Sequence, residues 1–128
     1  MTHVVPLRPE PPSITSLSFV QDYWVRDPGK RQGRNFRCFW SVRPSGDWGA
    51  DNDLGDRLAL EWLEYAQACL THGCAAAGNL NLIASDMPPG GDGVTVGFWS
   101  IVGYAAAHGA PEGINLAAFW GSSREAGA

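Results

Sequence analysis

Soft and nucleophilic side chains come together in the segment 69–74, which reads CLTHGC. Cys69, His72 and Cys74, with His108 as a fourth group, are candidate ligands for zinc. Structural zinc sites usually carry paired C-x-x-C knuckles, and this segment has none. A cysteine and histidine can also form a nucleophilic dyad, but the sequence indicates neither an orienting group nor an oxyanion site. Because Cys69 falls on the apolar stripe of an expected helix, we expect a small core residue there and no metal.

Carboxylates gather in segment 47–64, where one arginine against six acidic residues gives a net charge of 1 − 6 = −5. The run DNDLGD is similar to a calcium loop, but Gly55 comes one position early and no bidentate glutamate follows in register. Nothing fixes the separation of a carboxylate pair for acid–base work. We expect the carboxylates to complement a helix dipole and to line a wet helix face. A lesser alternative is that they imitate a nucleic-acid backbone for a basic partner.

The basic residues lie mostly in segment 22–43, which holds six of the nine in the chain and has a net charge of 6 − 2 = +4. Aromatic residues are interleaved with them, and a basic two-stranded ribbon of this kind can contact phosphates and stack on bases. Aromatics and arginines are also the residues that most often anchor protein interfaces. The alternative is a solvated loop above a strand whose aromatics are core. The candidate binding residues are Trp24, Arg31, Arg34, Arg37, Trp40 and Arg43.

No pattern in the sequence gives positive support to an enzyme. The glycine-rich stretch PPGGDGVTVG lacks the Lys-Ser/Thr of a phosphate-binding loop and the spacing of a dinucleotide-binding loop. The serines show no nucleophile elbow. We therefore expect no catalytic residue and no cofactor.

Two strands must position the basic, aromatic segment. Alternation of apolar and polar residues predicts one strand in segment 14–26 and a second in 36–43, with Phe36, Cys38, Trp40 and Val42 on one buried face. The intervening segment DPGKRQGRN predicts a turn or loop. The simplest arrangement is an antiparallel hairpin, which needs helices or a partner chain to cover its aromatic face.

Helices are expected after the hairpin. A long helix should begin after an N-cap at Ser45 or Asp47, or nearer Asp51 or Asp53, because Gly46, Gly49 and Gly55 weaken its first turns, and should end near residue 70 or 71 before Gly73. Leu63 and Leu70 widen its apolar stripe, which consists of Leu54, Leu58, Trp62, Tyr65 or Ala66, and Cys69. Shorter helices are predicted at 80–87, at 94–109 in preference to a strand at 94–99, and at 111–120.

The fold class predicted is α+β, with an N-terminal β-hairpin packed on a small helical body of three to four helices. Segment 1–12 is expected to be a flexible proline-rich arm, 13–120 a single domain, and 121–128 a frayed tail. No apolar run is long enough to cross a bilayer, and the first twelve residues lack the pattern of a signal peptide. An odd set of three cysteines favours a reducing cytoplasm.

Three segments together resemble small uncharacterised proteins of bacterial and prophage genomes: FWSVRPSGDW, GDRLALEWLEY and DGVTVGFWSIVGYAA. The resemblance covers about residues 36–108 and carries no catalytic or binding residue across. It implies a small cytoplasmic protein, from a mobile element, that works by binding a host protein.

The leading functional hypothesis is a non-enzymatic protein-binding module that acts as an adaptor or inhibitor of a host complex. The alternatives are a nucleic-acid-binding protein that uses the hairpin of residues 22–43, and an enzyme of unrecognised type. Homodimerisation is a further expectation, because edge strands pair readily.

Overall fold

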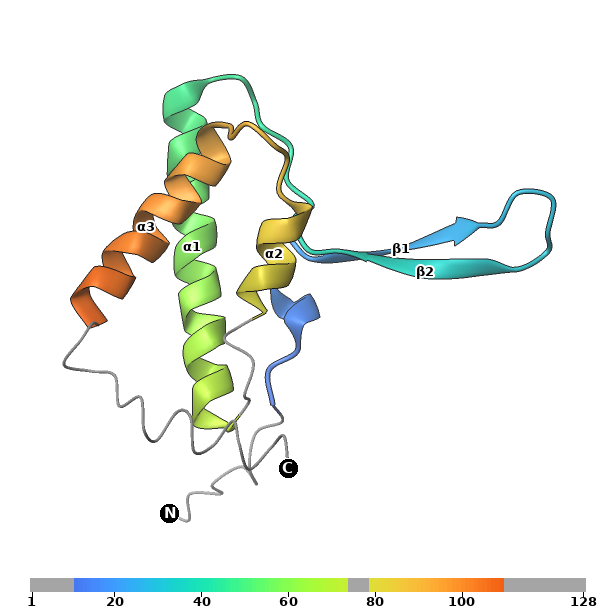
Figure 1. Cartoon of the computed structure of the whole chain (residues 1–128), viewed down its shortest axis with the longest axis horizontal. Helices are drawn as coiled ribbons and strands as arrows, with labels where there is room; N and C mark the ends of the chain where they lie inside the picture. The colour runs from blue at the N-terminus through green and yellow to red at the C-terminus, as the bar shows by residue number, and fades with distance from the viewer. Residues whose placement is uncertain (1–10, 74–78, 110–128) are drawn as a thin grey trace, which may run out of the picture.

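The computed structural model describes residues 11–73 and 79–109. A single 3-10 turn, η1 (Ile14–Ser16), precedes a β-hairpin of β1 (Gln21–Arg26) and β2 (Gly33–Cys38). The helices α1 (Trp48–Thr71), α2 (Leu80–Asp86) and α3 (Gly93–Gly109) follow (Figure 1). The predicted α+β class, with an N-terminal hairpin before three helices, is confirmed. The helix predicted at 111–120, the tail 121–128 and most of the proline-rich segment 1–12 lie outside the described residues.

Helix α1 begins where its local chemistry predicts. Asp47 is the N-cap, and its carboxylate accepts a hydrogen bond from the Ala50 N–H at 3.1 Å. The helix ends at Thr71, and Gly73 follows with a φ of +75°, a left-handed conformation that glycine adopts without strain. Of the predicted stripe, Leu58, Trp62 and Cys69 are buried. Leu70 is not part of it: this side chain is 72% exposed, because no other described element packs over that side of the last turn.

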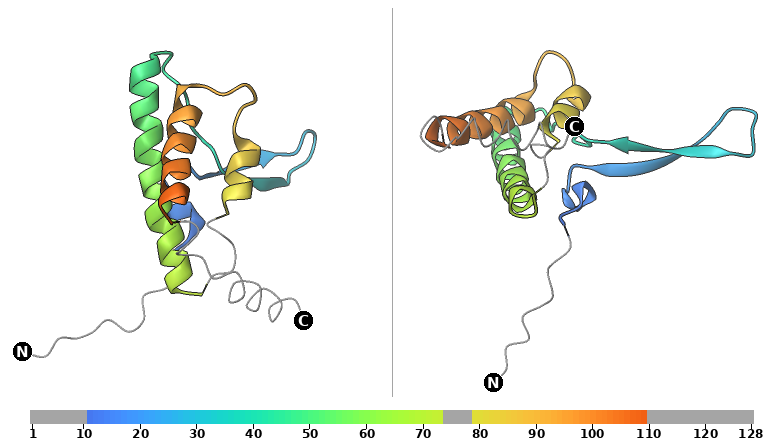
Figure 2. Two further views of the ribbon diagram at one scale, coloured as in Figure 1. Left: turned by 60° about the vertical axis from the view of Figure 1, so that its left-hand side comes forward. Right: turned by 60° about the horizontal axis from the view of Figure 1, so that its bottom comes forward.

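Helices α1 and α3 lie side by side and form the body of the molecule (Figures 1 and 2). Glycines let their backbones approach closely: a Cβ added at Gly55 of α1 would overlap the Val94 carbonyl and come within 2.7 Å of the Phe98 nitrogen. On α3, Gly97 faces the backbone of Asn52 in the same manner. Segment 94–99 is helical, as the sequence favoured over a strand. These close contacts hold the first turns of α3 against α1.

An aromatic cluster fills the core around Phe98, which is completely buried. The rings of Phe19, Trp40, Trp62 and Trp99 surround it, with centroids 5.1–6.4 Å from its own. The first two of these rings come from the segments that flank the hairpin, and Phe19 also touches Trp40 edge to face at 5.3 Å. The aromatic cluster thus joins the base of the hairpin to α1 and α3.

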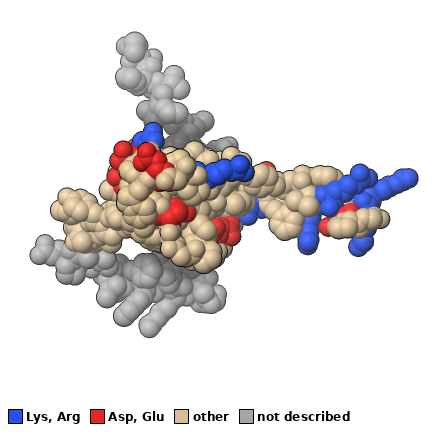
Figure 3. Space-filling view, turned by 90° about the horizontal axis from the view of Figure 1, so that it is seen from above, with Lys and Arg blue, Asp and Glu red and all other residues tan. Residues whose placement is uncertain are grey.

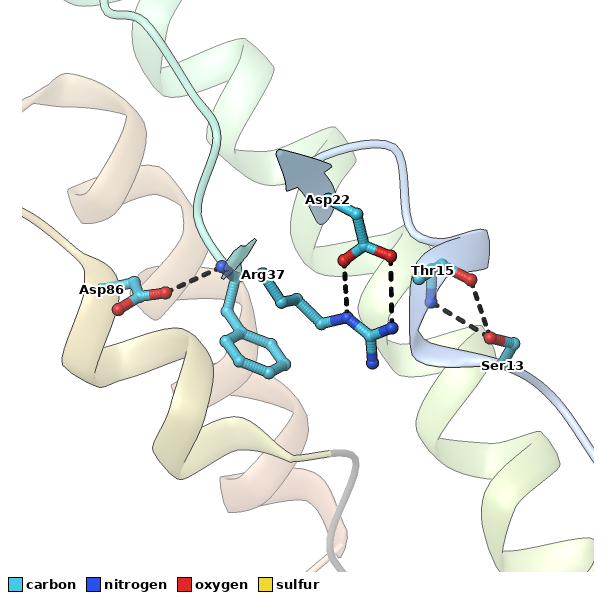
Figure 4. Close-up of polar contacts among 6 residues, drawn as sticks. Ser13, Thr15, Asp22, Arg37 and Asp86 are labelled. Carbon is cyan, nitrogen blue, oxygen red and sulfur yellow. Dashed lines mark hydrogen bonds and ion pairs between the residues drawn. The ribbon is translucent and has the colours of Figure 1, made fainter. Parts of the chain in front are cut away.

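Two carboxylates fasten the flanks of the hairpin to helices. Glu61 of α1 accepts hydrogen bonds from the backbone N–H and the hydroxyl of Ser18. Asp86 of α2 accepts one from the Phe39 N–H at 2.8 Å (Figure 4). Both strands are therefore fixed immediately outside the sheet.

The expectation that the hairpin has one buried face is wrong. β1 and β2 pair antiparallel from Gln21↔Cys38 to Arg26↔Gly33, and every residue of β1 is exposed. Figures 1 and 2 show the two strands extending away from the helices. The first strand begins only at Gln21, and Trp40 lies beyond the end of the second. The predicted strands therefore match the observed ones only over residues 21–26 and 36–38, and no described element covers either face of the hairpin.

Candidate functional site

The hairpin of residues 21–38, called the arm from here on, is the most distinctive surface of the protein. Its six-residue connection, 27–32, is closed by hydrogen bonds from the Asp27 N–H to the Gln32 carbonyl and from the Lys30 N–H to the Asp27 carbonyl, both at 3.1 Å. Pro28 and Gly29, with a φ of +72° at the glycine, occupy the two central positions of the latter turn. This is the geometry of a type II turn, which proline and glycine favour at these positions.

The register divides the arm into two faces. Tyr23 lies opposite Phe36 and Val25 opposite Arg34 on one face, where the Arg34 guanidinium sits 4.9 Å from the centre of the Phe36 ring. Trp24 projects from the other face and covers Gly33, which has no side chain to displace it. Trp24 is 59% exposed, and Tyr23, Val25 and Phe36 are each more than 40% exposed. The arm therefore presents large apolar side chains to solvent on both sides.

Two of the arginines are neutralised within the arm. Arg37 forms a two-pronged ion pair with Asp22, at 2.8 and 3.3 Å (Figure 4). The hydrogen bonds from Arg37 hold the pKa of the Asp22 carboxyl below its usual value. Arg34 pairs with Asp27 at 3.6 Å.

The other cations of the arm lie at or next to its tip. Within the described part of the chain, no carboxylate forms an ion pair with Arg26, Lys30 or Arg31. The arm carries five basic and two acidic residues, a net charge of 5 − 2 = +3, whereas residues 39–73 and 79–109 carry 2 − 8 = −6. Figure 3 shows this separation, with the lysine and arginine side chains at the far end of the arm and most carboxylates on the body.

The candidate binding residues divide into three groups. Trp24, Arg31, Arg34 and Arg37 all lie exposed on the arm. Arg43 is exposed but lies on the connection between β2 and α1. Trp40 is a correction: only 4% of it is exposed, because it packs between Phe19 and Phe98, so it holds the arm's base and offers no binding surface.

Of the cysteines and histidines that were candidate metal ligands or nucleophiles, those that the structure describes pack or form hydrogen bonds in or at the ends of helices. Cys69 lies in the core, as predicted, and the His72 ring bonds to the Ala68 carbonyl at 2.9 Å. The His108 ring lies 4.3 Å from the Tyr104 ring, tilted by 51°, at the end of α3, and Cys74 lies outside the described residues. Among the residues that the structure describes, no three histidine, cysteine or carboxylate side chains are grouped to hold a metal ion.

Asp51, in the acidic segment 47–64, does not lie on a wet helix face as expected. It is buried, and it accepts hydrogen bonds from the Ser45 hydroxyl at 2.6 Å, the Ser45 N–H at 2.9 Å and the Gly46 N–H at 3.1 Å. These bonds lower the pKa of the Asp51 carboxyl, that of the Ser45 hydroxyl most. Asp51 thus secures the loop before α1, and its neighbours in DNDLGD are spread around a helix.

The grooves on the described surface are shallow. One of about 650 Å³ lies between α2 and α3, lined by Met87, Val96 and Trp99 among others, and the Trp99 indole N–H points at the Met87 sulfur. One of about 400 Å³ lies at the arm's tip, around Arg26 and Arg31, and one of about 190 Å³ lies beside Ser18 and Leu58. Neither Asp51 nor a histidine lines any of these three grooves.

Sequence reasoning missed part of this surface. It assigned Phe36 to a buried face. It also did not separate Arg26 and Lys30, which form no ion pair among the described residues, from the paired arginines. A usable signal was present: the hairpin has more aromatics than a few short helices can cover. The pairing of Arg37 with Asp22 follows from the strand register, which the sequence alone does not give.

No described helix is long and apolar enough to cross a membrane. Comparison of the chain with known proteins found no matching family model, no matching curated protein and no matching solved structure.

Proposed function

We propose that the protein is a non-enzymatic protein-binding module that docks through its arm, as an adaptor or inhibitor of a host complex. One observation carries the proposal: an arm that projects from the body with Trp24, Tyr23, Val25 and Phe36 in solvent. Exposing such side chains is costly unless something covers them part of the time. The resemblance to small bacterial and prophage proteins supports a host complex as the partner. It also supports a cytoplasmic location, with which the unpaired thiols of Cys38 and Cys69 agree.

Nucleic acid is the second candidate, favoured by the cationic tip. The small number of unpaired cations and the negative charge of the body argue against nucleic acid as the first choice. Only three cations of the arm lack an acidic partner among the described residues, which predicts a log–log salt slope of about 0.9 × 3, or about 2.7. Binding with so few phosphate contacts is weak, and a body with a charge of −6 over its described residues repels a polyanion. Apolar contact on both faces suits a protein partner better.

The test removes the arm and leaves the core. Residues 23–36 are replaced by Asn-Gly, which closes a tight hairpin between Asp22 and Arg37. Since Phe19, Trp40 and the helices are untouched, we expect the variant to keep its helical circular dichroism and its unfolding transition. Tagged wild type and variant are then compared for the host proteins that each captures, quantified by mass spectrometry.

The matched control is Leu70→Ser, which removes an equally exposed apolar side chain far from the arm, on α1. We expect a partner that wild type and Leu70→Ser retain and the armless variant loses. Equal capture by all three proteins would contradict the proposal. Fluorescence anisotropy with labelled duplex DNA at about 50 mM salt tests the second candidate. Tight DNA binding that the armless variant loses would put nucleic acid in place of protein.

A further inference from the structure

The positive charges of the arm and the negative charges of the body are separated in space, so they do not neutralise one another within one molecule. The arm carries +3 and the described body −6. Because the arm extends away from the helices, its tip does not reach them (Figures 1 and 3). Attraction between the two regions therefore acts between molecules, over distances of about 8–10 Å in ordinary salt.

The outer face of α1, called the acidic face from here on, carries an apolar side chain ringed by charge. Leu60 is 55% exposed. Asp56 and Glu64 lie one turn before and after it, and Asp53 and Arg57 lie beside them at helical spacing. The net charge of this face is 1 − 3 = −2. An exposed leucine inside a charged ring resembles the centre and rim of a protein interface.

The arm has the complementary arrangement. Val25 and Phe36 form an apolar strip on one face of the arm. Lys30 and Arg31, which form no ion pair with a carboxylate of the described residues, lie just beyond this strip in the tip loop. The charge of the arm, +3, is opposite in sign to the −2 of the acidic face. Opposed charges of this kind fix the register of a contact and speed its formation.

We propose that the arm of one copy docks on the acidic face of a second copy, with Val25 and Phe36 over Leu60 and the tip cations against Asp53, Asp56 and Glu64. Every copy carries both surfaces, so two copies exchange arms reciprocally. The contact covers apolar side chains that a lone copy leaves in solvent. This inference does not rest on the proposed function, since the partner is the chain itself.

A charge-swap experiment tests the pairing. Variant one carries Lys30→Glu and Arg31→Glu, which changes the arm from +3 to 3 − 4 = −1. Variant two carries Asp53→Lys and Glu64→Lys, which changes the acidic face from −2 to −2 + 4 = +2. Each variant alone has an arm and a face of like sign. An equimolar mixture restores attraction at both contacts.

Sedimentation velocity at about 50 mM salt is the measurement. We expect wild type to self-associate, each variant alone to be monomeric, and the mixture to form one-to-one dimers. Between about 50 and 300 mM salt the dissociation constant of wild type should rise about tenfold or more. Arg43→Glu is the matched control, an exposed cation outside the arm, and should leave association unchanged.

Two results would overturn the inference. One is a wild type that stays monomeric at low salt and high concentration. The other is self-association that survives in variant one, whose changes lie in a loop and cannot unfold the helices. Either result leaves a host protein free to bind the arm, and failure to capture a host protein leaves self-association untouched.

Discussion

Replacing Gly55 by alanine tests the close approach of α1 and α3. The added methyl group would overlap the Val94 carbonyl and stand 2.7 Å from the Phe98 nitrogen, where ordinary contact begins at 3.4 Å. The obstructing atoms are backbone atoms of a helix, so no side chain can rotate away. The Phe98 nitrogen alone requires a separation of 3.4 − 2.7 = 0.7 Å at this point, and the Val94 carbonyl oxygen, which lies closer, requires more.

The free energy follows from two opposed terms. Alanine is favoured over glycine in a helix by about 1 kcal/mol. A gap of 0.5–1 Å, however, forfeits about a quarter to a half of the dispersion energy of each contact across it. Val94 and Phe98, both completely buried, would lose such contacts. Overpacking costs about 1–3 kcal/mol, and rigid backbone places this site at the upper end. We expect a net loss of about 2 kcal/mol in the free energy of unfolding.

Urea unfolding followed by far-UV circular dichroism measures this loss. With a slope of about 1–2 kcal/mol/M, the midpoint should fall by about 1–2 M. Gly103→Ala is the matched control, since a Cβ at Gly103 of α3 meets nothing within 4 Å. It should stabilise the protein by about 0.5–1 kcal/mol. If Gly55→Ala were as stable as wild type with an unchanged slope, the contact between the two helix backbones would be refuted.

Three further changes test the core, the loop before α1 and the arm's attachment. Phe98→Ala removes the centre of the aromatic cluster and should cost about 3–5 kcal/mol, enough to abolish a cooperative thermal transition in a small domain; an intact transition would contradict its central position. Asp51 has a lowered pKa in the folded protein, so its stabilisation is present above its ordinary pKa and is lost as pH falls toward the folded value. The melting temperature of Asp51→Asn should therefore be lower than that of wild type at neutral pH and should fall less on acidification. Parallel pH profiles of the two melting temperatures would contradict this. Glu61→Ala loses two hydrogen bonds to Ser18 and should cost about 1–2 kcal/mol by urea unfolding, with a negligible cost as the contrary result.

Local signals in the sequence were enough to predict the three helices that the structure describes. Gly73 and the stripe through Leu58 and Trp62 placed the end of α1 within a residue, and Asp47 was one of the starts that the sequence left open, beside Ser45, Asp51 and Asp53. These signals act within a few residues of chain, so no tertiary information is needed to interpret them. The hairpin was identified for the same reason.

Features that depend on distant partners were not predictable. Alternation through Tyr23, Val25 and Phe36 indicates a strand but cannot say whether anything covers it. Gly55 was interpreted as a weak point of its helix, but it is where α3 touches, which depends on how two helices pair. Asp51 was expected on a wet face, and its burial depends on a loop folding back over it.

The base of the arm has a consequence for how this protein can change over evolutionary time. Phe19 and Trp40 stand at the two feet of the arm, 5.3 Å apart, and the Ser41 N–H bonds across to the Phe19 carbonyl at 2.7 Å. This clamp fixes where the strands start but not how far they run. Inserting two residues in each strand would preserve which side chains share a face and lengthen the reach by about 7 Å. Inserting one in each would exchange the two faces. The length of the arm and the side chains that it presents can thus change in evolution without any change in the core of the body.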